Sequence, residues 1–188
     1  MNLIIFGPPG AGKGTQADFI VKKYNLFQLS TGELLRSEIK NKTALGIKIS
    51  SAINGGSLVS DDIVKKLVEI FISNEKFKGR LIFDGYPRNL IQAKTLNELL
   101  SQHNQKIDLV LKLSVSLDII KKRILERRTL EKRSDDSEEI AIKRYKTYEK
   151  STEPVIEYYK KLNLLKVIDG ERSIDQINKE ISDIITLI

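Results

Sequence analysis

The chain has 188 residues, with 32 lysines and arginines against 25 acidic residues, and it contains no cysteine. This length suits one compact domain, and the lack of cysteine excludes disulfides and thiolate metal sites, so no structural zinc is expected. The chain has no signal peptide and no apolar run near the roughly 20 residues of a membrane span, which predicts a cytoplasmic protein without a membrane partner. The net charge of +7 suggests an anionic partner, but aromatic residues make up only 6%, so no nucleic acid is expected.

Short apolar runs alternate with longer amphipathic stretches along the chain. The runs predict strands at residues 3–6, 27–29, 81–83, 109–111 and 164–168, and the stretches predict helices at 13–23, 32–40, 60–72, 89–102, 116–127, 137–161 and 173–187. Ser173 is the expected N-cap of the last helix. Continuous short apolar runs are typical of strands buried on both faces. The alternation predicts an α/β fold in three layers, a five-stranded parallel sheet with helices on both faces, whose ligands bind beyond the carboxyl ends of the strands.

A glycine-rich loop joins the first predicted strand to the first predicted helix. Residues 7–15 read Gly-Pro-Pro-Gly-Ala-Gly-Lys-Gly-Thr, which is the composition and context of a P-loop. The backbone N–H groups of such a loop and the N-terminus of its helix bind phosphate oxygens, and Lys13 adds a point charge for the terminal phosphates. A glycine-rich turn that only caps the helix is the simpler alternative.

One position of this loop departs from the general pattern. Gly14 follows Lys13 where P-loops generally carry serine or threonine, so the usual magnesium-ligating hydroxyl is missing. We therefore expect any Mg²⁺ to be held mainly by phosphates and water, with Asp84, at the end of the third predicted strand, behind the water. An aspartate that only caps the following helix is the alternative for Asp84.

Five segments resemble the nucleoside monophosphate kinase family in their order and spacing. They are Gly7-x-Pro9-Gly10-x-Gly12-Lys13-Gly14-Thr15-Gln16, Leu29-Ser30-Thr31-Gly32-Glu33-Leu34-Leu35-Arg36, Gly56-Ser57-Leu58-Val59, Phe83-Asp84-Gly85-Tyr86-Pro87-Arg88 and the arginine-rich stretch from Arg123 to Arg144. The resemblance covers nearly the whole chain. It implies phosphoryl transfer from ATP to a nucleoside monophosphate with the help of Mg²⁺.

The resemblance also implies roles for individual residues. For ATP binding it implies Gly10, Ala11, Gly12, Lys13, Gly14, Thr15, Arg127 and Arg172. For binding of the monophosphate it implies Thr31, Arg36, Ser57, Leu58, Val59, Gly85, Tyr86, Pro87, Arg88, Gln92, Arg133 and Arg144. The catalytic set, whose charges would surround the transferred phosphate, is Lys13, Arg88, Arg123, Arg127, Arg133 and Arg144.

The residue types suit these roles. The guanidinium group of Arg88 can make two parallel bonds to a phosphate, and Gln92, one helical turn later on the same face, can both accept and donate toward an adenine edge. Arg123 and Arg127 are four residues apart on one predicted helix, where like charges repel unless a polyanion lies between them. The alternative for each arginine, taken alone, is that it belongs to an ordinary basic helix face and binds no phosphate.

Two positions favour AMP as the acceptor. Adenylate kinases resemble this chain at Thr31 and Gln92, whereas UMP/CMP kinases tend to carry alanine and asparagine there. The resemblance therefore implies reversible transfer from ATP to AMP, giving two ADP, with a UMP/CMP kinase as the alternative. A non-catalytic P-loop protein that binds a nucleotide or nucleic acid would explain the charge, but it leaves the acceptor motifs and Gln92 unexplained.

Two segments are expected as insertions, a monophosphate-binding segment at 30–59 and a short lid at 128–136. The remaining core comprises residues 1–29, 60–127 and 137–188. Only residues 129–132 separate Arg128 from Arg133, so the lid has neither the length nor the cysteines of zinc-binding relatives. Closure of both segments over the substrates would exclude water. The resemblance implies a monomer.

Overall fold

The computed structural model of the chain describes residues 1–131 and 137–188. Its elements in chain order are β1 (Leu3–Phe6), α1 (Lys13–Tyr24), β2 (Phe27–Ser30), α2 (Thr31–Lys40), α3 (Ala44–Asn54), α4 (Asp61–Ile72), the short 3-10 helix η1 (Glu75–Phe77), β3 (Leu81–Asp84), α5 (Leu90–Gln102), β4 (Leu109–Ser114), α6 (Leu117–Glu131), α7 (Glu138–Lys161), β5 (Leu165–Asp169) and α8 (Ile174–Thr186). The strands form one parallel sheet in the order β2-β3-β1-β4-β5. The predicted α/β fold with a five-stranded parallel sheet is confirmed.

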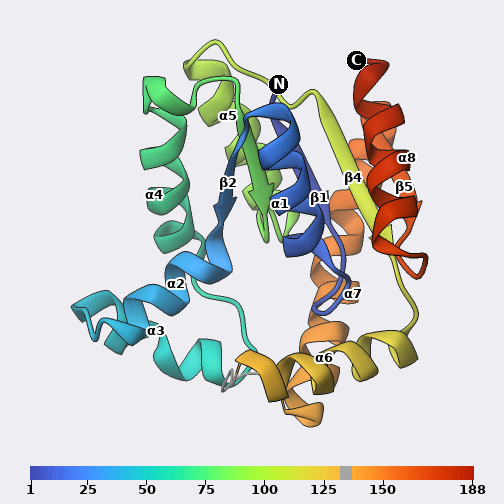
Figure 1. Ribbon diagram of the computed structural model, residues 1–188. Coiled ribbons are helices and arrows are strands. Elements are labelled where there is room, and N and C mark those ends of the chain that lie inside the picture. Colours follow the sequence, from blue (N-terminus) through green and yellow to red (C-terminus); the bar gives the residue numbers. More distant parts are fainter. Residues whose placement is uncertain (132–136) are drawn as a thin grey trace.

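Helices cover both faces of the sheet and bury an apolar layer on each (Figure 1). Ile4 and Phe6 of β1 pack on one side with side chains of α4, α5 and α7. Leu3 and Ile5 of the same strand pack on the other side with α1 and α8. Because successive side chains of a strand point to opposite faces, a central strand in three layers must be apolar at every position.

The last strand differs from its prediction. The run 164–168 does form a strand, β5, but the expected burial on both faces is wrong, because only Ile168 is buried while Lys166 and Val167 are exposed. The cause is position: β5 lies at the edge of the sheet and pairs only with β4. An apolar run in the sequence therefore identified the strand but not its place in the sheet.

Polar residues define where several helices begin. Ser173 caps α8 as predicted, and its side chain and that of Gln176 form a reciprocal capping box. Ser137 caps α7 by accepting from the backbone N–H of Ile140. These side chains satisfy N–H groups that have no partner within their own helix. None of the helices in the described ranges combines the length and the apolar character that a lipid bilayer requires.

Helix α6 is longer than the sequence predicted. It runs to Glu131, whereas the predicted helix ended at residue 127 and residues 128–136 were assigned to the lid. Residues 128–131 contain no glycine or proline, so nothing in them interrupts helical hydrogen bonding. Arg133, which was predicted to contact substrate, lies outside the described residues.

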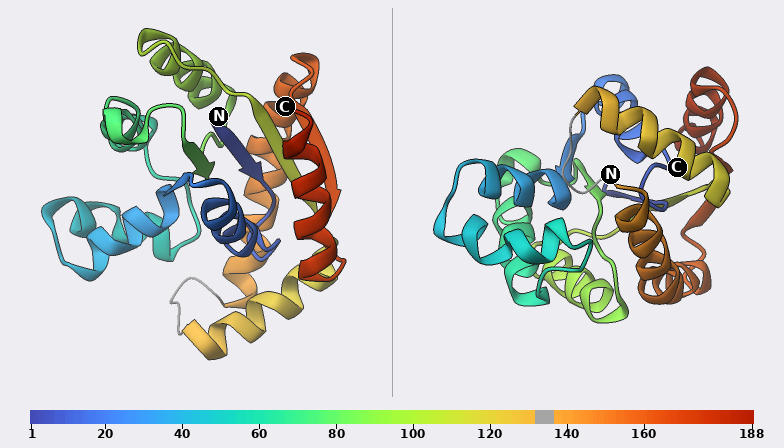
Figure 2. Two further views of the ribbon diagram at one scale, coloured as in Figure 1. Left: turned by 45° about the horizontal axis from the view of Figure 1, so that its top comes forward. Right: turned by 90° about the horizontal axis from the view of Figure 1, so that it is seen from below.

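Helices α2 and α3 extend from the body beside the carboxyl ends of the strands (Figures 1 and 2). A tight turn joins them: Thr43 accepts from the backbone N–H of Gly46 at 2.9 Å and donates its hydroxyl to Glu38 Oε2 at 2.5 Å. Leu35 of α2 and Ile49 of α3 are buried in the same apolar cluster as β1 and β3. The projecting pair is therefore attached to the core by packing.

Candidate active site

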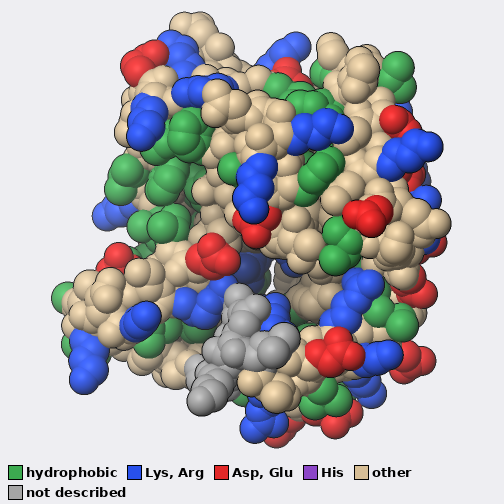
Figure 3. Space-filling view, viewed as in Figure 1, with side chains coloured by type: hydrophobic (Ala, Val, Ile, Leu, Met, Phe, Trp, Pro, Cys, Tyr) green, Lys and Arg blue, Asp and Glu red, His purple; other side chains and the backbone are tan. Residues whose placement is uncertain are grey.

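A pocket opens at the carboxyl ends of β1, β2 and β3, and α2, the α3–α4 connection and α7 form its other walls. Figure 3 shows this face hollowed, with lysine and arginine side chains in and around the hollow. The predicted site residues on its wall are Lys13, Thr31, Arg36, Ser57, Leu58, Val59, Gly85, Pro87, Arg88, Gln92 and Arg144. The fold therefore brings the phosphate loop and the acceptor segments, far apart in sequence, into one cavity.

The phosphate loop ends at a helix N-terminus that no side chain caps. Gly12 is the N-cap of α1 with a φ of 93°, a left-handed conformation that residues with a side chain rarely adopt. Lys13 follows it, and its Nζ donates to the carbonyl oxygens of Gly7 at 2.8 Å and Pro8 at 3.1 Å. An uncapped N-terminus beside a lysine is an anion-binding arrangement.

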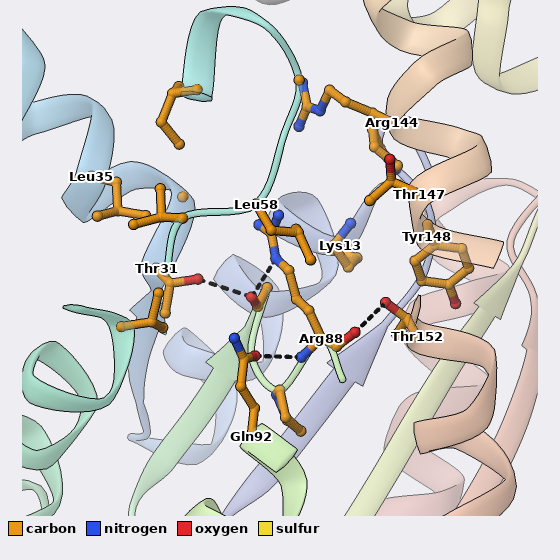
Figure 4. A pocket seen from close by; sticks show the side chains of 18 of the residues that line it. Lys13, Thr31, Leu35, Leu58, Arg88, Gln92, Arg144, Thr147, Tyr148 and Thr152 are labelled. Atoms are coloured by element: carbon orange, nitrogen blue, oxygen red, sulfur yellow. Dashed lines mark hydrogen bonds between the residues drawn. The ribbon is translucent and has the colours of Figure 1, made fainter. Parts of the chain in front are cut away.

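Positive charges converge on Lys13. Burial lowers the pKa of Lys13 to about 8; Asp84 opposes this change, while repulsion from Arg88, Arg144 and Arg127 lowers the pKa further. Figure 4 shows Lys13 between the side chains of Arg88 and Arg144. Cations crowded in a partly buried site repel one another, so the site favours a ligand with several negative charges.

The turn between β3 and α5 fixes Arg88 at the pocket. Gly85 has a φ of 77°, and a Cβ there would lie 3.1 Å from both Thr31 Oγ1 and Arg88 Nη2. Its carbonyl oxygen accepts from the Thr31 hydroxyl at 2.9 Å and from Arg88 Nε at 2.7 Å (Figure 4). Burial lowers the pKa of Arg88, with Asp84 opposing and Arg36 adding to the shift. One backbone oxygen thus orients two of the predicted AMP-binding side chains.

Gln92 is buried beneath this turn and is held by hydrogen bonds at each end of its amide. Its Oε1 accepts from the backbone N–H of Arg88 at 2.7 Å, and its Nε2 donates to Asp61 Oδ1 at 2.7 Å. Asn89 caps α5 by accepting from the Gln92 backbone N–H at 2.8 Å, and its Nδ2 donates to both Asp61 oxygens at 3.1 and 3.2 Å. The sequence prediction included Gln92 but missed Asp61 and Asn89.

Asp84 ends β3, as predicted, and it is buried. Its Oδ2 accepts from Gln28 Nε2 at 3.0 Å. The alternative that Asp84 only caps the next helix is wrong, because Asn89 is the N-cap of α5. Within residues 1–131 and 137–188, no group of three or more His, Cys, Asp or Glu side chains could hold a metal ion. A lone carboxylate suits a cation that keeps most of its ligands as water and phosphate.

Helix α7 contributes wall residues that the sequence prediction missed, namely Thr147, Tyr148 and Thr152. The hydroxyl of Thr152 donates to the carbonyl oxygen of Arg88 at 3.2 Å (Figure 4). Arg144, Tyr148 and Thr152 are spaced by four residues and therefore share one helix face. That spacing is the sequence signal that could have found them.

The same helix contacts the connection between α3 and α4. Lys143 Nζ donates to the carbonyl oxygen of Gly55 at 2.5 Å. A Cβ on Gly56 would lie 3.1 Å from Arg144 Cγ and from Ile140 Cγ2, so the Gly56 backbone packs closely against side chains of α7. This contact sets Arg144 beside the segment 57–59 on the pocket wall.

Other predicted residues lie outside the described wall of the pocket. They are Gly10, Ala11, Gly12, Gly14, Thr15, Asp84, Tyr86, Arg123, Arg127 and Arg172. Tyr86 is 1% exposed, and its hydroxyl donates to the Gln92 carbonyl oxygen at 3.2 Å, so it lies beneath the wall and supports α5. The glycines of this set belong to the phosphate loop itself.

Arg123 joins the phosphate loop to the turn after β5. Its Nη1 donates to the carbonyl oxygen of Ala11 at 3.4 Å and its Nη2 to that of Gly170 at 2.9 Å. Arg172, two residues beyond Gly170, forms a salt bridge with Glu180 of α8. The turn that carries Arg172 is thereby linked to the phosphate loop through one guanidinium group.

Comparisons with known proteins show a similarity over nearly the whole chain. The family model described as Adenylate kinase matches residues 5–164. The chain is similar to an adenylate kinase of Pelagibacter ubique (strain HTCC1062), 48% identical over 211 residues, covering 98% of this chain and 99% of the relative. Adenylate kinases of Fusobacterium nucleatum (40% identity; 98% of each chain) and Prochlorococcus marinus strain MIT 9301 (45% identity; 96% of each chain) are also similar. The likeness therefore extends well beyond the phosphate loop.

Proposed function

We propose a function from one premise: the chain belongs to the adenylate kinase family. It is an ATP:AMP phosphotransferase, and the reversible transfer of a phosphoryl group from ATP to AMP gives two ADP. The single observation that carries this function is one pocket that holds Lys13 of the phosphate loop together with Arg88 and Gln92 of the acceptor segments. A P-loop protein that only hydrolyses or only binds ATP does not need the residues of the acceptor segments.

The residues divide between the two nucleotides in this proposal. Residues 10–15 would bind the phosphates of ATP, with Lys13 at the terminal phosphates and Arg127 and the turn at Arg172 on the donor side. Arg36 and Arg88 would bind the AMP phosphate, and Gln92 the adenine edge. Support comes from Gly85, whose carbonyl oxygen holds Thr31 and Arg88 together, and from the position of Gln92 on the pocket wall.

The reaction requires positioning of the two substrates and neutralisation of their charge. It needs no general base, because the AMP phosphate is already an anion. Lys13, Arg88 and Arg144 all lie on the wall of the pocket. Preorganised cations in a partly dry site stabilise charge that spreads over the transferred phosphoryl group. Arg123, Arg127 and Arg133 complete the proposed set of cations.

Adenylate kinases use Mg²⁺ together with ATP, and the donor set of this chain suits such a cation. With Gly14 in place of a hydroxyl residue, we propose that Asp84 holds a water of the metal and that no protein atom ligates the metal directly. Asp84 is buried at the end of β3, and Gln28 orients it through Oδ2. The bound Mg²⁺ would neutralise charge on the ATP phosphates.

Two segments would close over the substrates, residues 30–59 on the AMP side and the short lid 128–136 on the ATP side. The contact of Lys143 with Gly55 already joins the end of the AMP-binding segment to α7. We expect the chain to act as a monomer.

An assay of ADP formation with AMP, UMP and CMP as rival acceptors tests the function. Thr31 and Gln92 predict that AMP gives the highest kcat/KM, by roughly a hundredfold or more over UMP. Equal rates with UMP or CMP would contradict the assignment. Titration with a dinucleotide that joins two adenosines through phosphates should saturate at one molecule per chain, since it spans both sites. Two independent dinucleotides per chain would contradict a shared pocket.

A further inference from the structure

The amide of Gln92 is held in one orientation by two partners of fixed hydrogen-bonding character. The Arg88 backbone N–H, 2.7 Å from Oε1, can only donate, and the Asp61 carboxylate, 2.7 Å from Nε2, can only accept. A flipped amide would set its NH₂ group against the Arg88 N–H and its oxygen against the carboxylate. Both contacts would then be repulsive inside a buried site, where a lost hydrogen bond is expensive.

Asp61 is itself held in place by its surroundings. Both of its oxygens accept from Asn89 Nδ2, at 3.1 and 3.2 Å, and it lies in the first turn of α4, where the helix dipole favours a negative charge. Asn89 is fixed in turn as the N-cap of α5, with its Oδ1 on the Gln92 backbone N–H. The carboxylate therefore presents a rigid acceptor to Gln92 from a neighbouring helix.

The Gln92 amide, held in this way, still has one N–H donor and one oxygen lone pair available for a ligand. An amide oxygen has two lone pairs and an NH₂ group has two hydrogens, and the protein uses one of each. Because Gln92 lines the pocket, the remaining N–H and lone pair can serve a bound base. Their order is fixed: the lone pair lies on the atom held by Arg88, and the N–H on the atom held by Asp61.

This order distinguishes two classes of base. Adenine offers an acceptor at N1 and a donor at its 6-amino group, which pair with an amide N–H and an amide oxygen. Hypoxanthine and guanine offer the reverse, an N1–H donor and a 6-oxo acceptor. An amide that could rotate would serve both classes, whereas a locked one serves only one, because the other leaves buried polar groups unpaired.

We propose that Asp61 is a specificity-positioning residue: by locking the Gln92 amide, it makes the acceptor site select 6-amino over 6-oxo purine monophosphates. The proposal rests on the proposed function, since it assigns Gln92 to the base of the acceptor nucleotide. Asp61 does not line the described pocket, so it acts through Gln92 and does not touch the substrate itself.

The test compares AMP with IMP in the Asp61→Asn variant. IMP differs from AMP only at the two positions that Gln92 would read. The introduced amide has one acceptor oxygen where the carboxylate has two, and its NH₂ group can donate to a flipped Gln92. We expect the ratio of kcat/KM for AMP over IMP to fall about tenfold, mainly through the KM of the monophosphate, while the KM for ATP stays unchanged.

Asp62→Asn is the matched control. Asp62 is the next acidic residue in the first turn of α4, and it is exposed, so its loss removes the same charge from the same helix terminus. Its AMP/IMP ratio should equal that of the unmodified chain. Because both substrates are assayed on one preparation, the ratio is independent of the folded fraction.

The outcomes separate this inference from the function on which it rests. A chain that phosphorylates AMP and disfavours IMP, with a ratio that falls in Asp61→Asn alone, supports the lock. If kcat/KM fell equally for AMP and IMP in Asp61→Asn, Asp61 would have only a structural role. That result would overturn the inference and leave the kinase function intact. An unmodified chain that accepts IMP as well as AMP would also overturn it. Failure to phosphorylate AMP at all would overturn the function itself.

Discussion

The two halves of the pocket are built in different ways. On the acceptor side, the turn from Asp84 to Gln92 is held by side chains from four other elements: Gln28 of β2, Thr31 of α2, Asp61 of α4 and Thr152 of α7. On the donor side, Lys13 bonds to carbonyl oxygens of its own phosphate loop, and the loop is joined to another element by Arg123 of α6, which donates to the Ala11 carbonyl oxygen.

This difference predicts how each half responds to substitution. A site made of backbone N–H groups and one cation depends on few side chains, so the loss of that cation should be severe. A site supported by a network of side chains should lose activity in steps, because each hydrogen bond contributes a modest amount.

Lys13→Met should remove the central cation of the donor half. We expect kcat to fall by roughly a thousandfold or more while the chain still folds, because charge stabilisation is lost without loss of packing. Steady-state assay of ADP formation and a thermal melt check these two expectations. Lys22→Met, an exposed lysine on the same helix, is the control and should keep full activity. Near-normal turnover in Lys13→Met would contradict the donor site.

Arg88→Lys tests the acceptor half at the arginine that bonds to both Gly85 and Thr152. Lysine cannot reproduce the fork of a guanidinium group that bonds to Gly85 and still reaches a phosphate. We expect kcat/KM for AMP to fall roughly a hundredfold with little change in the KM for ATP. Arg80→Lys serves as the control, because Arg80 lies immediately before the N-terminal end of β3. A change in the KM for ATP as large as that for AMP would remove the distinction between the halves.

Thr152→Val removes one hydrogen bond, that to the Arg88 carbonyl oxygen, at nearly constant volume. The expected effect is a rise of about fivefold to tenfold in the KM for AMP, since a net hydrogen bond contributes ~1 kcal/mol. Thr186→Val, whose hydroxyl bonds to its own helix at Ser182, is the control. No change in the KM for AMP would mean that α7 supports the turn by packing alone.

The lowered pKa of Lys13, about 8, predicts a pH dependence on the donor side. Above that pH the lysine of the ligand-free chain is largely neutral, and ATP phosphates raise its pKa again, so ATP binding takes up a proton. We expect a few-fold weaker binding near pH 9 than near pH 7.5, and calorimetry in buffers of different ionisation enthalpy measures the proton. Lys13→Met should show no such uptake.

The same shift affects stability with a definite sign. Between about pH 8 and the ordinary lysine pKa of 10.5, the unfolded chain holds a proton that the folded chain has released. The free energy of unfolding contributed by Lys13 therefore rises with pH across this window, and below pH 8 the cost of burying the charge is fully present. Denaturant titrations of the unmodified chain and of Lys13→Met at both ends of the window check the sign.

The sequence alone determined the alternation of strands and helices and the presence of a phosphate loop. Apolar runs and a glycine-rich loop are local signals, because periodicity and backbone freedom act over a few residues. It also identified the wall residues Lys13, Thr31, Arg88 and Gln92, whose motifs are short and contiguous. The family resemblance, carried by these motifs in order, indicated the expected activity.

The residues that support that site are set by tertiary packing. Thr152 meets Arg88 across 64 positions, and Asp61 meets Gln92 across 31, because α7 and α4 pack beside the β3–α5 turn. For the same reason, the sequence did not show whether a strand lies at the edge or in the centre of the sheet, as the exposed residues of β5 demonstrate. Long-range contacts depend on how whole elements pack, and no local pattern in one sequence encodes them. The chemistry of the pocket was therefore readable from the sequence, and the positioning of that chemistry was not.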